Sequence, residues 1–185
     1  MQVLIYSCAI MGLILAISFN LWMRRVARQY PSQLDPQQLS PSAKWRHNLQ
    51  LQARLSTFSP QLYRQNRHLG FWTVALFGTF TAVLALLMGA LEMSRLALAW
   101  PALFGISTVG YGVTRIKLNA AQLIGWQHLL QDAPQQAQQW QLAQVDLAKV
   151  QTRARALARG QYLLMAALLL IASAFELAVL TLLAW

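Results

Sequence analysis

Apolar residues fill four windows of the chain almost without interruption, and polar or turn-forming residues separate each window from the next. The windows are residues 3–23, 70–91, 96–114 and 162–185. An α-helix needs about 20 apolar residues to cross the roughly 30 Å hydrocarbon core of a bilayer. The pattern therefore predicts an all-α membrane protein with four transmembrane helices.

The connections between the windows differ in length. Residues 24–69 and 115–160 form two long polar segments, whereas only residues 92–95, "EMSR", separate the second window from the third. This short connection predicts that the second and third spans form an antiparallel hairpin. The first window has no basic residue before it and is followed by Arg24 and Arg25. A cleaved secretory signal has the opposite polarity, so we interpret this window as an uncleaved anchor.

Basic residues are concentrated in the two long segments. Residues 24–69 hold eight Lys and Arg, residues 115–160 hold six, and Arg95 is the only other one. Lys and Arg accumulate on the cytoplasmic side of a bacterial-type inner membrane. The distribution therefore predicts two cytoplasmic loops, with both termini outside. Anionic phospholipid head groups are the natural partners of such loops. No nucleic-acid partner is predicted, because that would need a separate basic module with exposed aromatic residues.

The composition agrees with a membrane protein and offers little for catalysis. Of the 185 residues, 57% are hydrophobic and 11% are charged, and the mean hydropathy is +0.39. The single cysteine, Cys8, cannot form a disulfide framework. His47, His68 and His128 are scattered without the spacing of metal ligands. Without a phosphate-binding loop or a hydrolase motif, we predict no metal, no cofactor and no enzymatic activity.

Helical periodicity continues into both long segments. In the first segment, Ser-Pro pairs at 40–41 and 59–60 signal helix starts. A single helical face there consists of Leu51, Leu55, Phe58 and Leu62. In the second segment, a helix continues to a break at Asp132 and Pro134. Beyond it, a heptad-like seam consists of Trp140, Ala143, Leu147, Val150, Ala154 and Leu157. We expect this seam to pack on the first face, so that the two loops form a short helical subdomain.

Small residues form stripes in the second and third windows. In lipid, such stripes let two helix backbones approach closely. The stripe of the second window consists of Ala75, Gly78, Ala82, Ala85 and Gly89. The stripe of the third window consists of Gly105, Thr108 and Gly112, in register with Pro101. We predict that these two stripes meet. Tryptophans near the window ends fit an aromatic belt at the membrane surface: Trp22, Trp72, Trp100 and Trp185.

One carboxylate interrupts the fourth window. Glu176 lies within "SAFELAV", and a charge in hydrocarbon is unfavourable unless it is neutralised or paired. Counted from the outer ends of their spans, Ser107 and Thr81 lie at a similar depth, roughly 15 Å, and Arg95 is the nearest basic residue. Three interpretations stay open: a neutral Glu176 bonded to these hydroxyls, a contact with a partner subunit's helix, or a proton or cation site that includes Thr108.

The order of span, helical cytoplasmic segment, span, short turn and span is similar to that of membrane insertases of the Oxa type. The segment "LFGTF" at residues 76–80 resembles part of proton-driven motor stators. Both similarities concern topology and carry no residue roles. We therefore expect a small non-enzymatic protein that acts as a scaffold or accessory subunit, bound to another membrane protein or to further copies of itself. The alternatives are a proton or cation pathway through Glu176, and an anionic-lipid-binding or insertase-like protein.

Overall fold

The chain is all-α throughout the part that the computed structural model describes, residues 1–30, 41–89, 95–140, 142 and 145–184. Its elements in chain order are α1 (Gln2–Gln29), α2 (Pro41–Phe58), α3 (Pro60–Leu87), the short 3₁₀ helix η1 (Arg95–Leu98), α4 (Ala99–Asp132), α5 (Pro134–Gln139) and α6 (Leu147–Leu183). Pro60 and Pro134 stand at the first position of their helices, where a missing N–H removes no hydrogen bond.

Three of these helices are long and apolar enough to cross a membrane: α1, α3 and α6. They indicate a membrane-embedded helical bundle. The predicted third span, residues 96–114, falls on η1 and the first half of α4, which is not one of the three. Because α4 begins at Ala99, it offers only about 24 Å of uncharged helix before Arg115.

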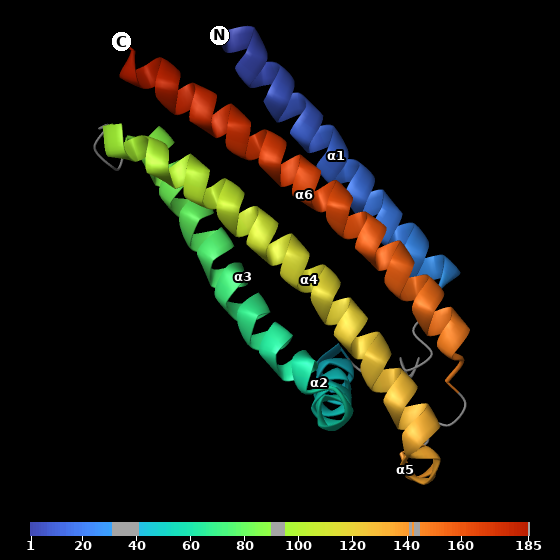
Figure 1. Ribbon diagram of the computed structural model, residues 1–185. Coiled ribbons are helices and arrows are strands. Elements are labelled where there is room, and N and C mark those ends of the chain that lie inside the picture. The colour runs from blue at the N-terminus through green and yellow to red at the C-terminus, as the bar shows by residue number, and fades with distance from the viewer. Residues whose placement is uncertain (31–40, 90–94, 141, 143–144, 185) are drawn as a thin grey trace.

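The four long helices lie side by side in the order α1, α6, α4, α3, as Figure 1 shows. Each packs against its neighbour in this order, and α6 provides nearly all of the contacts that α1 makes. Both chain termini lie at one end of the array, which we call the upper end. The opposite end holds α2 and α5 and is called the lower end.

The lower end has its own hydrophobic core. Leu51, Leu55 and Leu62, three residues of the face predicted in the first loop, are buried there. They pack with residues of α4 and the following segment, which are Leu118, Ala121, Trp126, Leu129, Ala137 and Leu142. Gly125 permits this contact, since a Cβ added to it would lie 3.3 Å from the Leu55 carbonyl oxygen. The core joins α2 to the lower half of α4.

The predicted seam from Trp140 to Leu157 is not one helix. Helix α5 ends at Gln139, and α6 begins at Leu147, where the Asp146 carboxylate accepts a hydrogen bond of 2.9 Å from the Ala148 backbone N–H. This N-cap fixes the start of α6 after the position of Trp140. Trp140, Leu147 and Val150 still pack around the lower core, whereas Ala154 and Leu157 lie farther up α6 and are half-buried. Ala143 is outside the described residues.

The small-residue stripes pack differently from the prediction. Gly105 and Gly112 of α4 lie against α6 rather than α3, with Ala172 and Met165 beside them. Gly78 of α3 is exposed, and a Cβ added to it would meet no atom within 4 Å. The remaining members of the predicted α3 stripe are half-buried or exposed: Ala75, Ala82, Ala85 and Gly89.

Aromatic side chains make the contact between α3 and α4 instead. The ring of Trp72 lies against Gly110, where any side chain would overlap it. Higher up, the rings of Phe80 and Phe104 lie 5.6 Å apart, and Phe175 of α6 is 6.2 Å from each. Large aromatic rings of α3 therefore lie between the two helices, where the predicted small-residue contact would have brought the backbones together.

Candidate functional site

Glu176 lies on the outer surface of the bundle. Its side chain is exposed, and within the described residues no hydrogen bond or ion pair engages its carboxylate. The contacts of Gly105 with Ala172 and of Gly112 with Met165 fix the register of the antiparallel helices α4 and α6. Both contacts put Glu176 opposite Pro101, near the upper end of α4. Of the three interpretations of Glu176, the one that bonds it to hydroxyls inside the bundle does not fit this exposed position.

The hydroxyl groups expected beside Glu176 are not gathered there. Ser107 and Thr108 are buried, with 4% and 0% exposure, about 9 Å below the level of Pro101 along α4. Thr81 is exposed, and its hydroxyl donates to the Phe77 carbonyl oxygen over 2.9 Å. The side chain of Arg95 is outside the described part of the chain. The structure thus brings Gly105, Thr108 and Gly112 to the α4–α6 interface and leaves Glu176 outside it.

Glu176 belongs to an exposed stripe on α6. The stripe, called the Glu176 face below, consists of Ala166, Leu169, Ser173, Glu176 and Leu180, all exposed and spaced by three and four residues. This spacing keeps the five side chains on one side of the helix. The Ser173 hydroxyl donates to the Leu169 carbonyl oxygen over 3.0 Å. Its lone pairs remain able to accept a hydrogen bond from a neighbouring chain.

Two buried polar atoms near the α4–α6 interface have no hydrogen-bond partner within the described residues. They are the Thr108 hydroxyl oxygen and the Gln161 side-chain carbonyl oxygen. Other hydroxyls of the long helices donate to the carbonyl four residues earlier, as Thr73 and Thr79 do over 2.7 Å. An unpaired buried polar group typically lowers stability by about 1–3 kcal/mol. Sequence analysis did not single out Gln161, although it follows the last basic residue of α6 by only two positions.

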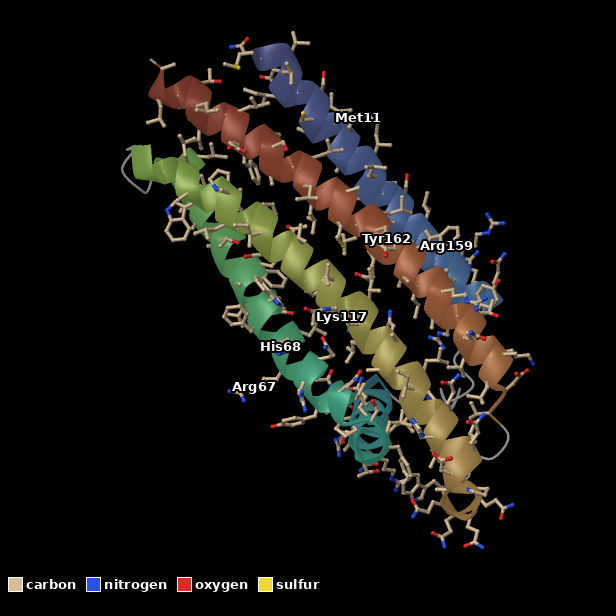
Figure 2. All side chains as sticks on the ribbon, in the orientation of Figure 1. Met11, Arg67, His68, Lys117, Arg159 and Tyr162 are labelled. Atoms are coloured by element: carbon tan, nitrogen blue, oxygen red, sulfur yellow. The ribbon has the colours of Figure 1, made fainter. Side chains whose placement is uncertain are left out.

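Basic residues of the long helices gather at one level of the bundle. On α6 they are Arg155 and Arg159, and the register with α4 puts Lys117 opposite Gly160, next to Arg159. The indole N–H of Trp22 donates to the Ala156 carbonyl oxygen, so the basic end of α1 lies at the same level. Figure 2 shows Arg67 of α3, Lys117 of α4 and Arg159 of α6 in this layer. The layer separates the apolar upper part of the bundle from the lower core.

A shallow groove opens at the lower end. Its lining consists of Ala53, Arg54, Thr57, Phe58, Gln136 and Trp140. The Arg54 guanidinium carbon lies 5.1 Å from the Trp140 ring centroid, and Phe58 meets the same indole edge-on at 6.2 Å. This cation–π contact fixes an aromatic surface between α2 and α5. The groove holds no carboxylate or nucleophile for chemistry.

The ionisable groups do not form a recognisable catalytic arrangement in the described parts of the chain. Three or more His, Cys, Asp or Glu side chains nowhere come together there as metal ligands would. His128 Nδ1 lies 2.7 Å from the Asp132 carboxylate at the end of α4, and both side chains are more than half exposed. Comparisons with protein-family models, curated proteins and solved structures give no match.

Proposed function

We propose that this chain is a non-enzymatic accessory subunit or scaffold of a membrane complex, and that its Glu176 face binds a transmembrane helix of a partner protein. One observation carries the proposal: Glu176 is exposed, and has no partner among the described residues, on a helix that is long and apolar enough to span a membrane. A carboxylate in contact with lipid is unfavourable. A partner helix that brings a hydrogen-bond donor or a basic side chain to Glu176 removes this penalty.

We infer that the donor comes from another chain, because the basic side chains that the structure describes lie too far from Glu176. Arg159 is separated from Glu176 by 17 positions of α6, which is about 25 Å along the helix. Small side chains on the face, Ala166 and Ser173, allow a second helix to approach closely. Charge complementarity and spacing together favour a helix as the occupant of this face.

The proposal includes a four-span arrangement in a bacterial-type inner membrane. In it α4 crosses the membrane together with α1, α3 and α6. Both termini are outside, and the lower end is cytoplasmic. The position of α4 between α3 and α6 supports this arrangement, since a helix packed between two spans shares their environment. The concentration of basic residues at and below one level supports the orientation. The lower core then forms a helical platform on the cytoplasmic side.

A proton or cation pathway through Glu176 is the competing function. Such a pathway needs polar side chains in line with the carboxylate. Ser107 and Thr108 are buried about two turns lower, whereas Glu176 is exposed. The geometry therefore favours a helix contact over a pathway as the reason for the acid.

Position-specific cross-linking tests the proposal. In a chain with Cys8→Ala, a single cysteine at Ser173 samples the Glu176 face, and one at Ile10 samples an exposed position of α1. We expect membranes at native expression to give a discrete adduct with one partner from Ser173→Cys and none from Ile10→Cys. Adding Glu176→Leu should abolish the adduct, whereas Glu176→Gln should keep part of it. A strictly monomeric chain without an adduct would contradict the proposal, and an adduct of two identical chains would replace the partner with a second copy.

A further inference from the structure

Two cations and a phenol lie together at the surface where α4 and α6 meet. Lys117, Arg159 and Tyr162 are all exposed. Because Gly112 lies against Met165, the register of the two helices puts Lys117 of α4 opposite Gly160 of α6. Along the bundle, Lys117 therefore lies between the levels of Arg159 and Tyr162. Figure 2 shows the three labelled side chains at about the same level on the neighbouring helices. Tyr162 is the uppermost of the cluster, with 60% exposure.

The two cations have no acidic side chain beside them in the described part of the chain. Within the described residues neither Lys117 nor Arg159 has an ion-pair partner. Asp132 is 15 positions below Lys117 on α4, about 22 Å along the helix. Glu176 lies a similar distance above, and Asp146 caps the start of α6. None of the three acids that the structure describes therefore neutralises this cluster, which leaves it open to an anion from another molecule.

The surface directly above the cluster is apolar. On α4 it continues through Val113, Val109 and Ile106, which are 38%, 40% and 57% exposed. On α6 it continues through Ala166 and Leu169. A ligand for the whole surface therefore needs an anionic group at one end and a long apolar part extending toward the upper end of the bundle.

We propose that Lys117, Arg159 and Tyr162 bind the head group of an anionic phospholipid whose acyl chains lie along the exposed seam between α4 and α6. The phosphate accepts hydrogen bonds from the ammonium and guanidinium groups, and the phenol donates a third. Tyr162 then stands at the depth where aromatic residues with a polar tip are favoured. A free phosphate would use the cations and leave the apolar seam without a role.

Binding of the lipid head group does not require the proposed partner helix. The head-group residues lie below the Glu176 face, which begins at Ala166, and the acyl chains share Ala166 and Leu169 with that face. The lipid site can therefore exist in a chain that has no protein partner. Loss of lipid binding would leave the Glu176 proposal untouched, and loss of the partner would leave the lipid site intact.

The test measures lipid retention by the purified full-length chain. Mild-detergent protein is titrated with phosphatidylglycerol or phosphatidylcholine of identical acyl chains, and bound lipid is counted by native mass spectrometry. We expect the double variant Lys117→Gln/Arg159→Gln to weaken phosphatidylglycerol binding about 30-fold, since each basic residue contributes on the order of fivefold near an anionic lipid. Tyr162→Phe should weaken it about fivefold.

The matched control removes the same charge from another helix. Arg64→Gln/Arg67→Gln changes two exposed basic residues of α3 and should leave lipid retention within about twofold of the parent, because α3 is not part of the seam between α4 and α6. Equal loss in both double variants would overturn the site and leave only general electrostatic attraction. Equal retention of phosphatidylcholine, or displacement of the lipid by inorganic phosphate at millimolar concentration, would also overturn it. Circular dichroism checks that each variant keeps the parent's helix content.

Discussion

The indole Nε1–H of Trp22 donates a hydrogen bond of 2.9 Å to the carbonyl oxygen of Ala156, across 134 positions of the chain. Gly160 makes the approach possible, because a Cβ there would lie 3.1 Å from Trp22 Cδ1 and 3.2 Å from Met23 Sδ. The lower half of α1 is therefore held on α6 by a tryptophan that fits into the space above a glycine.

Trp22→Phe should weaken this contact by about 0.5–1.5 kcal/mol, the usual contribution of one hydrogen bond. Gly160→Leu should weaken the contact between α1 and α6 further, since the added side chain displaces the Trp22 indole. Thermal unfolding in detergent measures both changes. Trp100→Phe is the control, because that tryptophan is 38% exposed. Equal midpoints for Trp22→Phe and the parent would contradict the assigned hydrogen bond.

Gly112 and Gly78 should respond in opposite ways to the same substitution. A methyl group at Gly112 overlaps the Met165 side chain, whereas one at Gly78 meets no atom within 4 Å. Gly112→Ala should destabilise the bundle by about 1–3 kcal/mol. Gly78→Ala should be neutral or stabilising by up to about 1 kcal/mol, since alanine favours helix. Reversed signs in a denaturant titration would show that α4 packs its small stripe on α3 after all.

Thr108 offers a test of the unpaired hydroxyl. Thr108→Val replaces a buried polar atom without a partner by a methyl group of similar size. We expect the variant to be as stable as the parent or more stable by about 1–3 kcal/mol. Thr79→Val is matched in chemistry, but it removes a hydrogen bond to the Ala75 carbonyl oxygen. A larger loss for Thr108→Val than for Thr79→Val would mean that the Thr108 hydroxyl has a partner in the membrane.

The lower core should unfold independently of the upper part of the bundle. Leu129 is fully buried in it, so Leu129→Ala should destabilise this region by about 2–5 kcal/mol. Limited proteolysis should then cleave α2 and the α5 region faster while α3 and the upper half of α6 stay protected. The control is Leu49→Ala, a position that is 44% exposed. Uniform loss of protection along the chain would show that the two regions unfold together.

Glu176→Gln separates the two explanations of the intramembrane acid. The variant keeps the shape and most hydrogen bonds but does not titrate. If the acid serves a helix contact, proteoliposomes of the parent and of the variant should both match protein-free vesicles in proton flux. A flux in the parent that Glu176→Gln abolishes would favour the pathway and reject the proposed role.

Periodicity predicted the elements of the fold better than it predicted their neighbours. Helix starts at Ser-Pro pairs and the break after Asp132 follow from local chemistry, and α2, α3 and α4 begin or end there. Which face of α4 meets which helix depends on volumes that no local pattern contains. Trp72 and Phe80 fill the α3 side, so Gly105 and Gly112 of α4 face α6 instead.

The surroundings of Glu176 could not be predicted from periodicity either. Counting residues from span ends put Glu176 at the depth of Ser107, because it assumed that all spans end at one plane. The contact between Gly105 and Ala172 shifts α6 relative to α4 and raises Glu176 to the level of Pro101. Its outward direction also depends on packing, which the 3.6-residue period leaves open. Lys117 and Arg159 lie at neighbouring levels because of this packing register. The sequence pattern alone could not place them together.

The packing of α1 on α6 has a consequence for how the protein is made. The ribosome makes α1 before α6, with residues 30–146 between them. At 5–20 residues per second, α1 waits roughly 6 to 23 s in the membrane before its neighbour exists. During that interval its glycine-containing face is open to chaperones, to the insertion machinery and to other nascent chains. Packing of α1 into the bundle therefore waits for the synthesis of α6, and a chain that is truncated before α6 leaves α1 without a place to dock.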